Sequence, residues 1–146
     1  MKNTFKNKRI GVLCGGESSE RAISLRSGEA IYNGLRQNGL DVVMLDTNNN
    51  PRQCLTHARI DFAFIALHGK GGEDGHIQRI LNRMHIPYTG SDERGAYNSF
   101  NKVKTKIILK HHGIPVPRYA VISARTWRQK SARFSFPMIL KPIADG

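Results

Sequence analysis

The residues best suited to chemistry lie in a glycine-rich stretch, residues 67–75, with the sequence Leu-His-Gly-Lys-Gly-Gly-Glu-Asp-Gly. It combines an imidazole, an ammonium group and two carboxylates with four glycines, which let the backbone take positive φ and approach a ligand closely. Asp74 is placed to cap a following helix, and the free N–H groups at a helix N-terminus attract anions. The pattern predicts a ligand-binding loop; the alternative is a turn with a purely structural role.

Hydrophobic periodicity predicts the elements that hold this loop. Residues 61–67 form an apolar run typical of a buried strand in a parallel sheet. Residues 75–84 carry apolar side chains at i, i+3, i+4 and i+7, which is the pattern of an amphipathic helix. In open α/β sheets, ligands bind beside the carboxyl ends of the strands, so the loop lies where a site is expected.

A second loop of interest follows a predicted strand over residues 9–14, which runs into a pair of glycines. Ser18 and Ser19 are candidate N-caps of a helix that is expected to end near Gly39. Glu20 falls in the first turn of that helix, where a carboxylate suits the helix dipole.

The rest of the first part continues the alternation of strands and helices. A strand is predicted over residues 41–45 and a loop over 46–51, then the strand that carries His68, and finally a short strand or turn over 86–90. This alternation predicts an α/β fold with an open parallel sheet flanked by helices. We place the end of this first domain at residue 91.

The sequence past residue 91 predicts a different and incomplete unit. Its expected elements are one helix with an apolar face from Ala96 to Ile108 that ends near Gly113, an extended segment over 119–122, a helix over 124–133 and a strand over 136–142. Two strands and a helix cannot cover both faces of a sheet, so this part is expected to be an opened domain. Lys141 is unusual in an apolar strand unless it meets an anion, whereas Lys102 could simply be solvated on its helix.

Composition narrows the class of protein. The 146 residues are 39% hydrophobic and 23% charged, as in soluble globular proteins. The N-terminus lacks the apolar core of a signal peptide, and no apolar run is long enough to span a bilayer, so a cytoplasmic location is expected. Two cysteines, Cys14 and Cys54, provide neither a disulfide framework nor a metal cluster.

The net charge of +12 is unevenly distributed. Residues 1–91 hold 12 Lys/Arg and 8 Asp/Glu, whereas residues 92–146 hold 11 and 3. The strongly basic second part favours phosphate-bearing partners, either nucleotides or nucleic acid. Nucleic acid is disfavoured, because aromatic residues are not interleaved with the basic ones and no nucleic-acid-binding motif is present.

Several motifs in a fixed order carry a resemblance to a known family. They are residues 15–21 with Ser24, residues 67–75, residues 87–91, Asn101-Lys102 with Thr105-Lys106, residues 113–115, residues 136–142, and Asp145-Gly146. Together they resemble the D-alanine–D-alanine ligases of the ATP-grasp superfamily over nearly the whole chain. In that family ATP phosphorylates the carboxylate of one D-alanine, and the amine of a second attacks the acyl phosphate, giving the dipeptide used in peptidoglycan and hence the cell wall.

The resemblance implies a domain organisation. Residues 1–91 are expected to form the substrate-binding α/β domain, the pre-ATP-grasp domain of the family, with its open parallel sheet flanked by helices. Residues 92–146 are expected to form the truncated start of the ATP-grasp nucleotide-binding domain. The family's Mg²⁺-binding carboxylates, a serine loop, a tyrosine and an arginine are expected only beyond residue 146, so no metal ligand is assigned within this chain.

The resemblance also implies roles for four residues. Glu20 and His68 are the candidate catalytic and substrate-binding residues, with Glu20 holding the ammonium group of the first D-alanine and His68 lying beside its carboxylate and the growing acyl phosphate. Lys102 and Lys141 are the candidate cofactor-binding residues, at the ATP phosphates. Without the family context, Glu20 could be only a partner of the helix dipole and His68 a satisfied core histidine.

Two departures from the family pattern raise the local positive charge. This chain has Phe100-Asn101-Lys102 where the family usually has Met-Asp-Lys, and Ala22 where the family often has a second Glu. Loss of a carboxylate at Asn101 affects how the neighbouring lysine is positioned.

The expected function is therefore ATP-dependent ligation of two D-alanines, with ATP and Mg²⁺ as cofactors, and the 146-residue chain is expected to be inactive alone. One alternative is a non-catalytic module that binds D-alanine or an anion and needs a partner chain. Another is a different ATP-grasp ligase acting on another acid. The expected partners are D-alanine and ATP, with a second copy or a complementing C-terminal chain left open, and neither nucleic acid nor a membrane is expected.

Overall fold

Three parallel strands form the centre of the structure: β1 (Arg9–Cys14), β2 (Asp41–Asp46) and β3 (Phe62–Ile65). Their order is β2-β1-β3, with Ile10 of β1 opposite Val42 on one side and Phe62 on the other. The structure, a computed structural model, describes residues 5–131 and 134–145.

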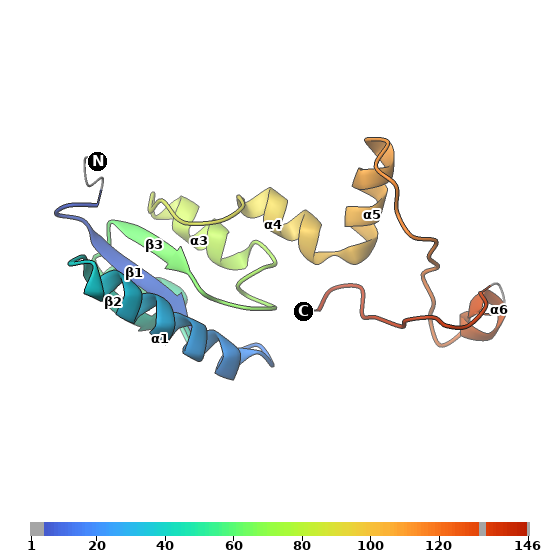
Figure 1. Ribbon diagram of the computed structural model, residues 1–146, viewed down its shortest axis with the longest axis horizontal. Coiled ribbons are helices and arrows are strands. Elements are labelled where there is room, and N and C mark those ends of the chain that lie inside the picture. The colour runs from blue at the N-terminus through green and yellow to red at the C-terminus, as the bar shows by residue number, and fades with distance from the viewer. Residues whose placement is uncertain (1–4, 132–133, 146) are drawn as a thin grey trace.

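Helices cover both faces of this sheet (Figure 1). Helix α1 (Arg21–Gln37) packs on one face, and α2 (Pro51–Ala58) and α3 (His76–Arg83) pack on the other. Residues of β1 alternate between the two layers: Val12 faces α1, and Leu13 faces α2 and α3. The predicted open parallel sheet flanked by helices is confirmed.

Close approach of α1 to the sheet depends on one glycine. A Cβ at Gly28 would lie 2.5 Å from the Cβ of Cys14, so no larger residue fits without displacing the helix. Cys14 is fully buried there, and burial raises the pKa of its thiol.

Sequence periodicity does not predict helix α2, since it gives a loop over residues 46–51 and then the strand over residues 61–67, with no element between them. Asn50 caps it by accepting a hydrogen bond from the Gln53 N–H at 3.0 Å, and Pro51 occupies its first turn. Leu55 is its buried anchor. The Asn50-Pro51 pair, typical of a helix N-terminus, is the feature of the sequence that could have predicted this helix.

The short strand or turn predicted over residues 86–90 extends the sheet by a single bridge. Tyr88 pairs in parallel with Ala63, whose N–H donates to the Pro87 carbonyl at 2.9 Å and whose carbonyl accepts from the Thr89 N–H at 3.1 Å. The chain then leaves the sheet for the second part.

The expectation of one helix, with an apolar face from Ala96 to Ile108 and an end near Gly113, is wrong in number, because the structure has two helices there: α4 (Glu93–Phe100) and α5 (Lys102–His111). Asn101 interrupts them with a non-helical ψ of 101°, and its side chain accepts from the N–H groups of Val103 and Lys104 at 3.1 and 3.0 Å. Asparagine offers its side chain as an N-cap, so the chain ends one helix and starts another.

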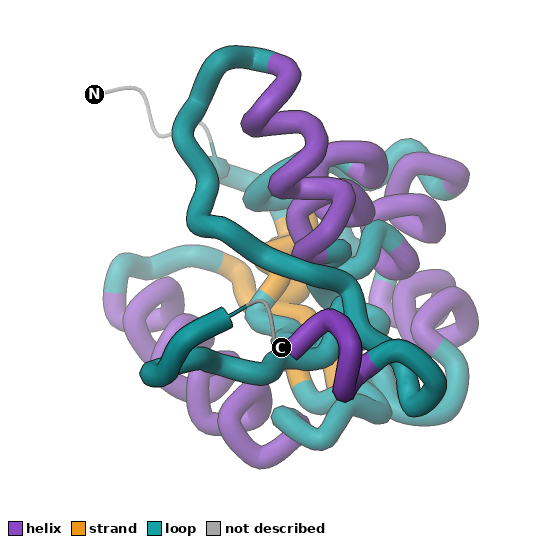
Figure 2. Tube along the Cα trace, turned by 90° about the vertical axis from the view of Figure 1, so that its right-hand side faces the viewer, coloured by secondary structure: helices purple, strands orange, loops and turns teal. Residues whose placement is uncertain are grey.

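The strand expected over residues 136–142 is also wrong: in the structure this segment is irregular, as Figure 2 shows along the path to the C-terminus. Among the described residues, no neighbouring strand offers it a hydrogen-bonding edge. Residues 119–122, expected to be an extended segment, belong to neither a helix nor a strand in the structure. Helix α6 (Trp127–Ser131) accounts for part of the helix expected over 124–133, whose residues 132–133 lie outside the described ranges.

None of the helices within the described ranges combines the length and the apolar character needed to cross a bilayer.

Candidate functional site

The loops that follow β1 and β3 meet at the carboxyl edge of the sheet. The Ser18 hydroxyl donates to the backbone carbonyl of His68 at 2.8 Å. Gly69 has φ +66°, and the position a Cβ would take there lies 2.6 Å from a carboxylate oxygen of Glu20. The structure therefore brings the Glu20 carboxylate against the backbone beside His68, and a side chain at residue 69 would push it away.

The imidazole of His68 is held by polar groups on both sides. Its Nε2 lies 3.2 Å from the Ser27 hydroxyl of α1, and its Nδ1 lies 3.8 Å from a carboxylate oxygen of Glu73. The His68 side chain is 35% exposed, so it is not an enclosed core histidine. When Ser27 donates to Nε2, Nδ1 carries the proton and faces the carboxylate.

Ser27 and the contact of Glu73 with His68 are features that sequence reasoning missed. Ser27 follows the buried Ser24 by one helical turn, and the Ser24 hydroxyl donates to the Ala66 carbonyl at 2.8 Å. A stripe of serines one turn apart on α1 therefore faces the strand that leads into the His68 loop. Two serines one turn apart on the face of α1 that packs on the sheet are the feature of the sequence that could have predicted this contact.

The serines predicted to cap α1 do something else. Glu20 occupies the N-cap position, without a side-chain capping hydrogen bond, so neither Ser18 nor Ser19 is the N-cap. The Ser18 hydroxyl is used for the bond to the His68 loop and accepts from the Glu20 N–H at 3.2 Å. Ser18 therefore makes a contact with a distant loop instead of capping its own helix.

The sequence predicts that Asp74 caps α3, but in the structure Asp74 precedes the N-cap residue, and its carboxylate accepts from the His76 N–H at the first helical residue at 3.0 Å. Gly75 with φ +89° is the N-cap residue itself. Asp74 therefore stabilises the turn into α3.

An ion pair fixes the glycine turn after β1. Arg21 forms two hydrogen bonds to the Asp46 carboxylate, at 2.8 and 2.6 Å, and a third to the Gly16 carbonyl at 3.2 Å. The hydrogen bonds from Arg21 hold the pKa of Asp46 below its usual value. Arg21 thus joins the start of α1 to the end of β2 and keeps the site loop in place.

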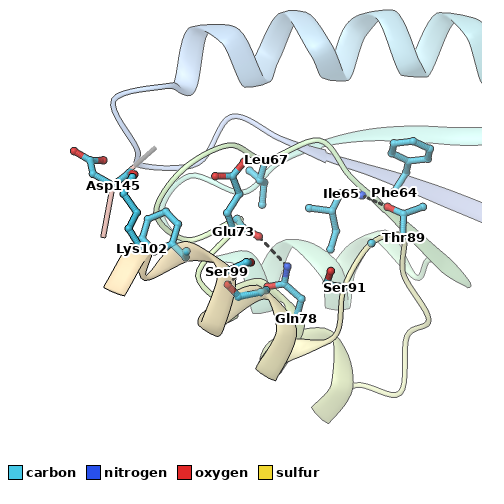
Figure 3. Close-up of a pocket in the computed structure, with 14 residues that line it drawn as sticks. Phe64, Ile65, Leu67, Glu73, Gln78, Thr89, Ser91, Ser99, Lys102 and Asp145 are labelled. Carbon is cyan, nitrogen blue, oxygen red and sulfur yellow. Dashed lines mark hydrogen bonds between the residues drawn. The ribbon is translucent and has the colours of Figure 1, made fainter. Parts of the chain in front are cut away.

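Two cavities border these loops. The smaller, about 290 Å³, lies at the carboxyl ends of all three strands and is lined by residues that include Gly16, Thr47, His68 and Lys70. The larger, about 580 Å³, lies between β3, α3 and α4 (Figure 3). Glu73, which pairs with His68, lines the larger cavity, so the two are adjacent across the loop.

The two lysines singled out by the sequence lie in different settings. Lys102 lines the larger cavity at the start of α5, where its N–H donates to the Ile143 carbonyl at 2.8 Å and its ammonium group donates to the Asp145 carbonyl. Lys141 is exposed in the irregular segment, because the strand expected to present it does not form. The structure places Lys102 near the Glu73–His68 loop and leaves Lys141 at the surface.

The described part of the chain offers no metal site. In residues 5–131 and 134–145 there is no group of three or more His, Cys, Asp or Glu side chains arranged to hold a metal ion. Glu73 and Asp74 are used instead for the contact with His68 and for the turn into α3.

Comparison with known proteins places these features in a family context. Residues 46–91 match a family model described as the D-ala D-ala ligase N-terminus. The chain is 52% identical over 115 residues to the D-alanine–D-alanine ligase of Carboxydothermus hydrogenoformans, covering 79% of this chain and 37% of that protein. It is 49% identical over 136 residues to that of Desulforamulus reducens, covering 92% and 44%.

Solved structures agree with the sequence relatives. A crystal structure of D-alanine–D-alanine ligase from Bacillus anthracis superposes with a TM-score of 0.76 at 32% identity, covering 95% of this chain and 46% of that one. A structure of the same ligase complexed with ATP gives a TM-score of 0.67 at 38% identity, covering 76% and 39%. The chain spans less than half the length of these relatives.

Proposed function

From the relationship of this chain to the N-terminal part of the D-alanine–D-alanine ligases, we propose that it supplies the substrate-binding domain and the start of the nucleotide-binding domain of such an ATP-dependent ligase. Residues 1–91 are the substrate-binding domain and residues 92–146 the start of the ATP-grasp domain. The product is D-alanyl-D-alanine for peptidoglycan synthesis.

The observation that carries the proposal is the meeting of the loops after β1 and β3. It sets the Glu20 carboxylate beside the backbone at Gly69, next to His68. A zwitterionic amino acid needs an anionic group for its ammonium end and a hydrogen-bond donor for its carboxylate end. Glu20 serves the first need and His68 the second, and Glu73 and Ser27 orient the His68 ring.

Activation of the carboxylate by ATP brings two anions together, so fixed positive charge is required at the phosphates. Lys102 is assigned to an ATP phosphate; it lies on the wall of the larger cavity, and an incoming phosphate oxygen would replace the Asp145 carbonyl as partner of its ammonium group. Lys141 is assigned the same role from the surface segment. Mg²⁺ supplies further neutralisation in phosphoryl transfer, but the donor set of the described residues does not fit it, so no ligand is assigned here.

Binding of D-alanine by the chain alone tests the site. We expect D-alanine, and not L-alanine, to shift the His68 ring resonances in NMR titrations. Glu20→Gln is expected to weaken binding about tenfold, because it removes the charged partner of the ammonium group. Glu29→Gln, the same change at an exposed position of α1, is the matched control. Equal affinity for the two enantiomers, or equal effects of the two variants, contradicts the proposed site.

Activity is tested separately. The purified chain is expected to make no D-alanyl-D-alanine from D-alanine, ATP and Mg²⁺, because its described residues include no cluster of three or more His, Cys, Asp or Glu side chains that could hold the metal ion. Mixing it with the separately expressed C-terminal part of the Desulforamulus reducens ligase is expected to give product. Synthesis of the dipeptide by the chain alone would disprove the expected dependence.

A second candidate function is a non-catalytic module that works with another chain. It is favoured by the exposed apolar segment of residues 136–140, in which Phe136, Ile139 and Leu140 are 79–85% exposed. D-alanine binding without any complementation of synthesis would support this candidate over the ligase. Preference for another acid over D-alanine would instead support a different ATP-grasp ligase.

A further inference from the structure

The second part of the chain carries an excess of positive charge. Residues 94–144 contain 11 Lys/Arg and no Asp or Glu. The ion pairs formed between described residues all lie within residues 8–93. The ATP phosphates of the proposed function would use Lys102 and Lys141 and leave the other nine cations without an assigned partner. Cations at this density, with no carboxylate among them, favour a partner that carries several negative charges.

Several of these cations lie against aromatic rings. Three such pairs, measured from the cation to the ring centre, are Lys106 with Tyr119 at 5.6 Å, Arg118 with Phe134 at 5.0 Å, and Arg128 with Trp127 at 5.5 Å. Contacts of this length are cation–π interactions. Tyr119 is 39% exposed and Trp127 is 49% exposed, so both rings remain accessible beside their cations.

These pairs belong to one continuous surface, because residues 118–121 connect α5 with α6. Tyr119 contacts Lys106 of α5, and the Val121 carbonyl accepts a hydrogen bond from the ammonium group of Lys130 on α6 at 2.9 Å. Figure 1 shows α5 and α6 at the end of the molecule away from the sheet. The basic–aromatic surface is defined by four cations and two rings: Lys106, Arg118, Tyr119, Trp127, Arg128 and Lys130.

Two kinds of macromolecular partner present many negative charges, a nucleic acid and an anionic membrane. Exposed rings with cations beside them favour nucleic acid, because bases stack on the rings while phosphates meet the cations. A membrane-binding helix needs an apolar face, whereas the four residues that follow Trp127 in α6 are Arg-Gln-Lys-Ser. A duplex hides the faces of its bases, so stacking on protein rings requires a single strand.

We propose that the basic–aromatic surface binds single-stranded nucleic acid without sequence preference. Bases stack on Tyr119 and Trp127, and the phosphates pair with the four cations of the surface. Along the chain, aromatic residues do not alternate with basic ones, so the sequence disfavours nucleic acid. The folded arrangement of residues 106–130 brings the rings and the cations together.

Fluorescence titration of the full chain with an oligothymidylate of about 12 nucleotides tests the surface. Trp127 is the single tryptophan of the chain, so a base that stacks on it is expected to quench the emission directly. Heparin has dense negative charge but no bases, and it is expected to leave the emission unchanged at saturation. With four phosphates contacted, a rise in salt from about 50 to about 200 mM is expected to weaken oligothymidylate binding about fiftyfold.

Variants separate the cations from the rings. The double variant Arg118→Gln/Arg128→Gln is expected to weaken oligothymidylate binding about tenfold, and the same rise in salt should then cost only about sevenfold. Arg36→Gln/Arg52→Gln, the same charge change at exposed positions of the first part, is the matched control and should change binding less than twofold. Tyr119→Leu keeps an apolar side chain but removes the ring, so it is expected to weaken oligothymidylate binding about fivefold and to leave heparin binding unchanged. All the changed side chains are exposed, so folding is expected to be retained.

Three outcomes overturn the proposal. Oligothymidylate that fails to quench Trp127, even though heparin binds, would make the surface a general polyanion site. Binding to phosphatidylglycerol vesicles without quenching by oligothymidylate would make it a membrane-binding surface. Equal effects of the two double variants would mean that only the net charge of the chain matters.

The D-alanine titration described above is independent of this surface. Quenching by oligothymidylate without D-alanine binding retains the basic–aromatic surface and removes the ligase assignment. D-alanine binding without quenching by oligothymidylate removes the surface and retains the assignment.

Discussion

The two parts of this chain differ in how their apolar side chains are used. In residues 9–91, both faces of the sheet are covered and the side chains of β1 are buried from Ile10 to Cys14. In the described part of residues 92–146, Ala96 is the one buried hydrophobic residue, and α5 has no buried residue. A comparable apolar sequence therefore gives a core in one part and an exposed surface in the other.

The difference shows that an apolar pattern stabilises a fold only when a second layer of helices or strands covers it. The second part is joined to the first mainly through α4, where Glu93 accepts a hydrogen bond from Arg79 of α3 at 2.7 Å. It has no strand against which α5 or residues 136–140 could pack among the described residues. Stability is therefore expected to reside in the first part, which also carries Glu20 and His68.

The largest expected effect contrasts two leucines. Leu13 is fully buried between the sheet and α2 and α3, whereas Leu140 is 79% exposed. Leu13→Ala is expected to lower the free energy of unfolding by about 2–5 kcal/mol, and Leu140→Ala by less than about 0.5 kcal/mol. Urea denaturation followed by circular dichroism measures both. Similar losses for the two variants would mean that residues 136–140 pack in solution.

A smaller effect is expected from two glycines of α1. Gly28→Ala drives a methyl group into Cys14 and is expected to cost about 1–3 kcal/mol. No atom lies within 4 Å of the position that a Cβ would take at Gly34, so Gly34→Ala is expected to stabilise by up to about 1 kcal/mol through helix propensity. Thermal unfolding midpoints that move in the same direction would contradict the close packing of α1 on β1.

In the second part, Asn101→Ala tests the break between α4 and α5. It removes the acceptor of two N–H groups and is expected to cost about 1 kcal/mol. The measurement is amide hydrogen exchange at Val103 and Lys104, which should become faster. Because this part contributes little to the core, the midpoint of global unfolding should move less than with Gly28→Ala. Slower exchange would mean that α4 and α5 merge into one helix.

The smallest effect concerns the ion pair of the site loop and its pH dependence. The folded state lowers the pKa of Asp46, so the carboxylate stabilises the fold above its unfolded pKa of about 3.9, and this contribution is lost as the pH falls through the folded value. The pair is partly exposed, so Asp46→Asn is expected to cost less than about 1 kcal/mol at pH 7.

Denaturation at a series of pH values between 7 and 3 measures this cost. The stability difference between the wild type and Asp46→Asn should shrink below about pH 4. Asp41→Asn, at the exposed start of β2, is the charge-matched control. A difference that grows on acidification would contradict the sign of the pKa shift.

Sequence reasoning recovered the elements that are fixed by local pattern. These elements are the strands β1 and β3 and the helices α1 and α3. Each consists of apolar residues in a regular pattern next to a glycine turn. The roles of Glu20, His68, Lys102 and Lys141 stay predictions. The structure brings Glu20 and His68 into neighbouring loops. The strand that was expected to present Lys141 does not form.

The elements that the sequence analysis did not predict correctly have two physical causes. Helix α2 and the break at Asn101 depend on single side-chain caps, which a periodicity argument overlooks. The strand expected over residues 136–142 depends on a partner strand elsewhere in the chain, which no local pattern reports.

The sequence by itself determined the three strands, the glycine loops and the chemical groups in them, because backbone conformation and the polar–apolar pattern are local properties. Only the tertiary structure decided that the Ser18 hydroxyl bonds the His68 loop and that Glu73 joins His68 to a second cavity. Those contacts join residues far apart in the chain, and their distances depend on how the helices pack against the sheet.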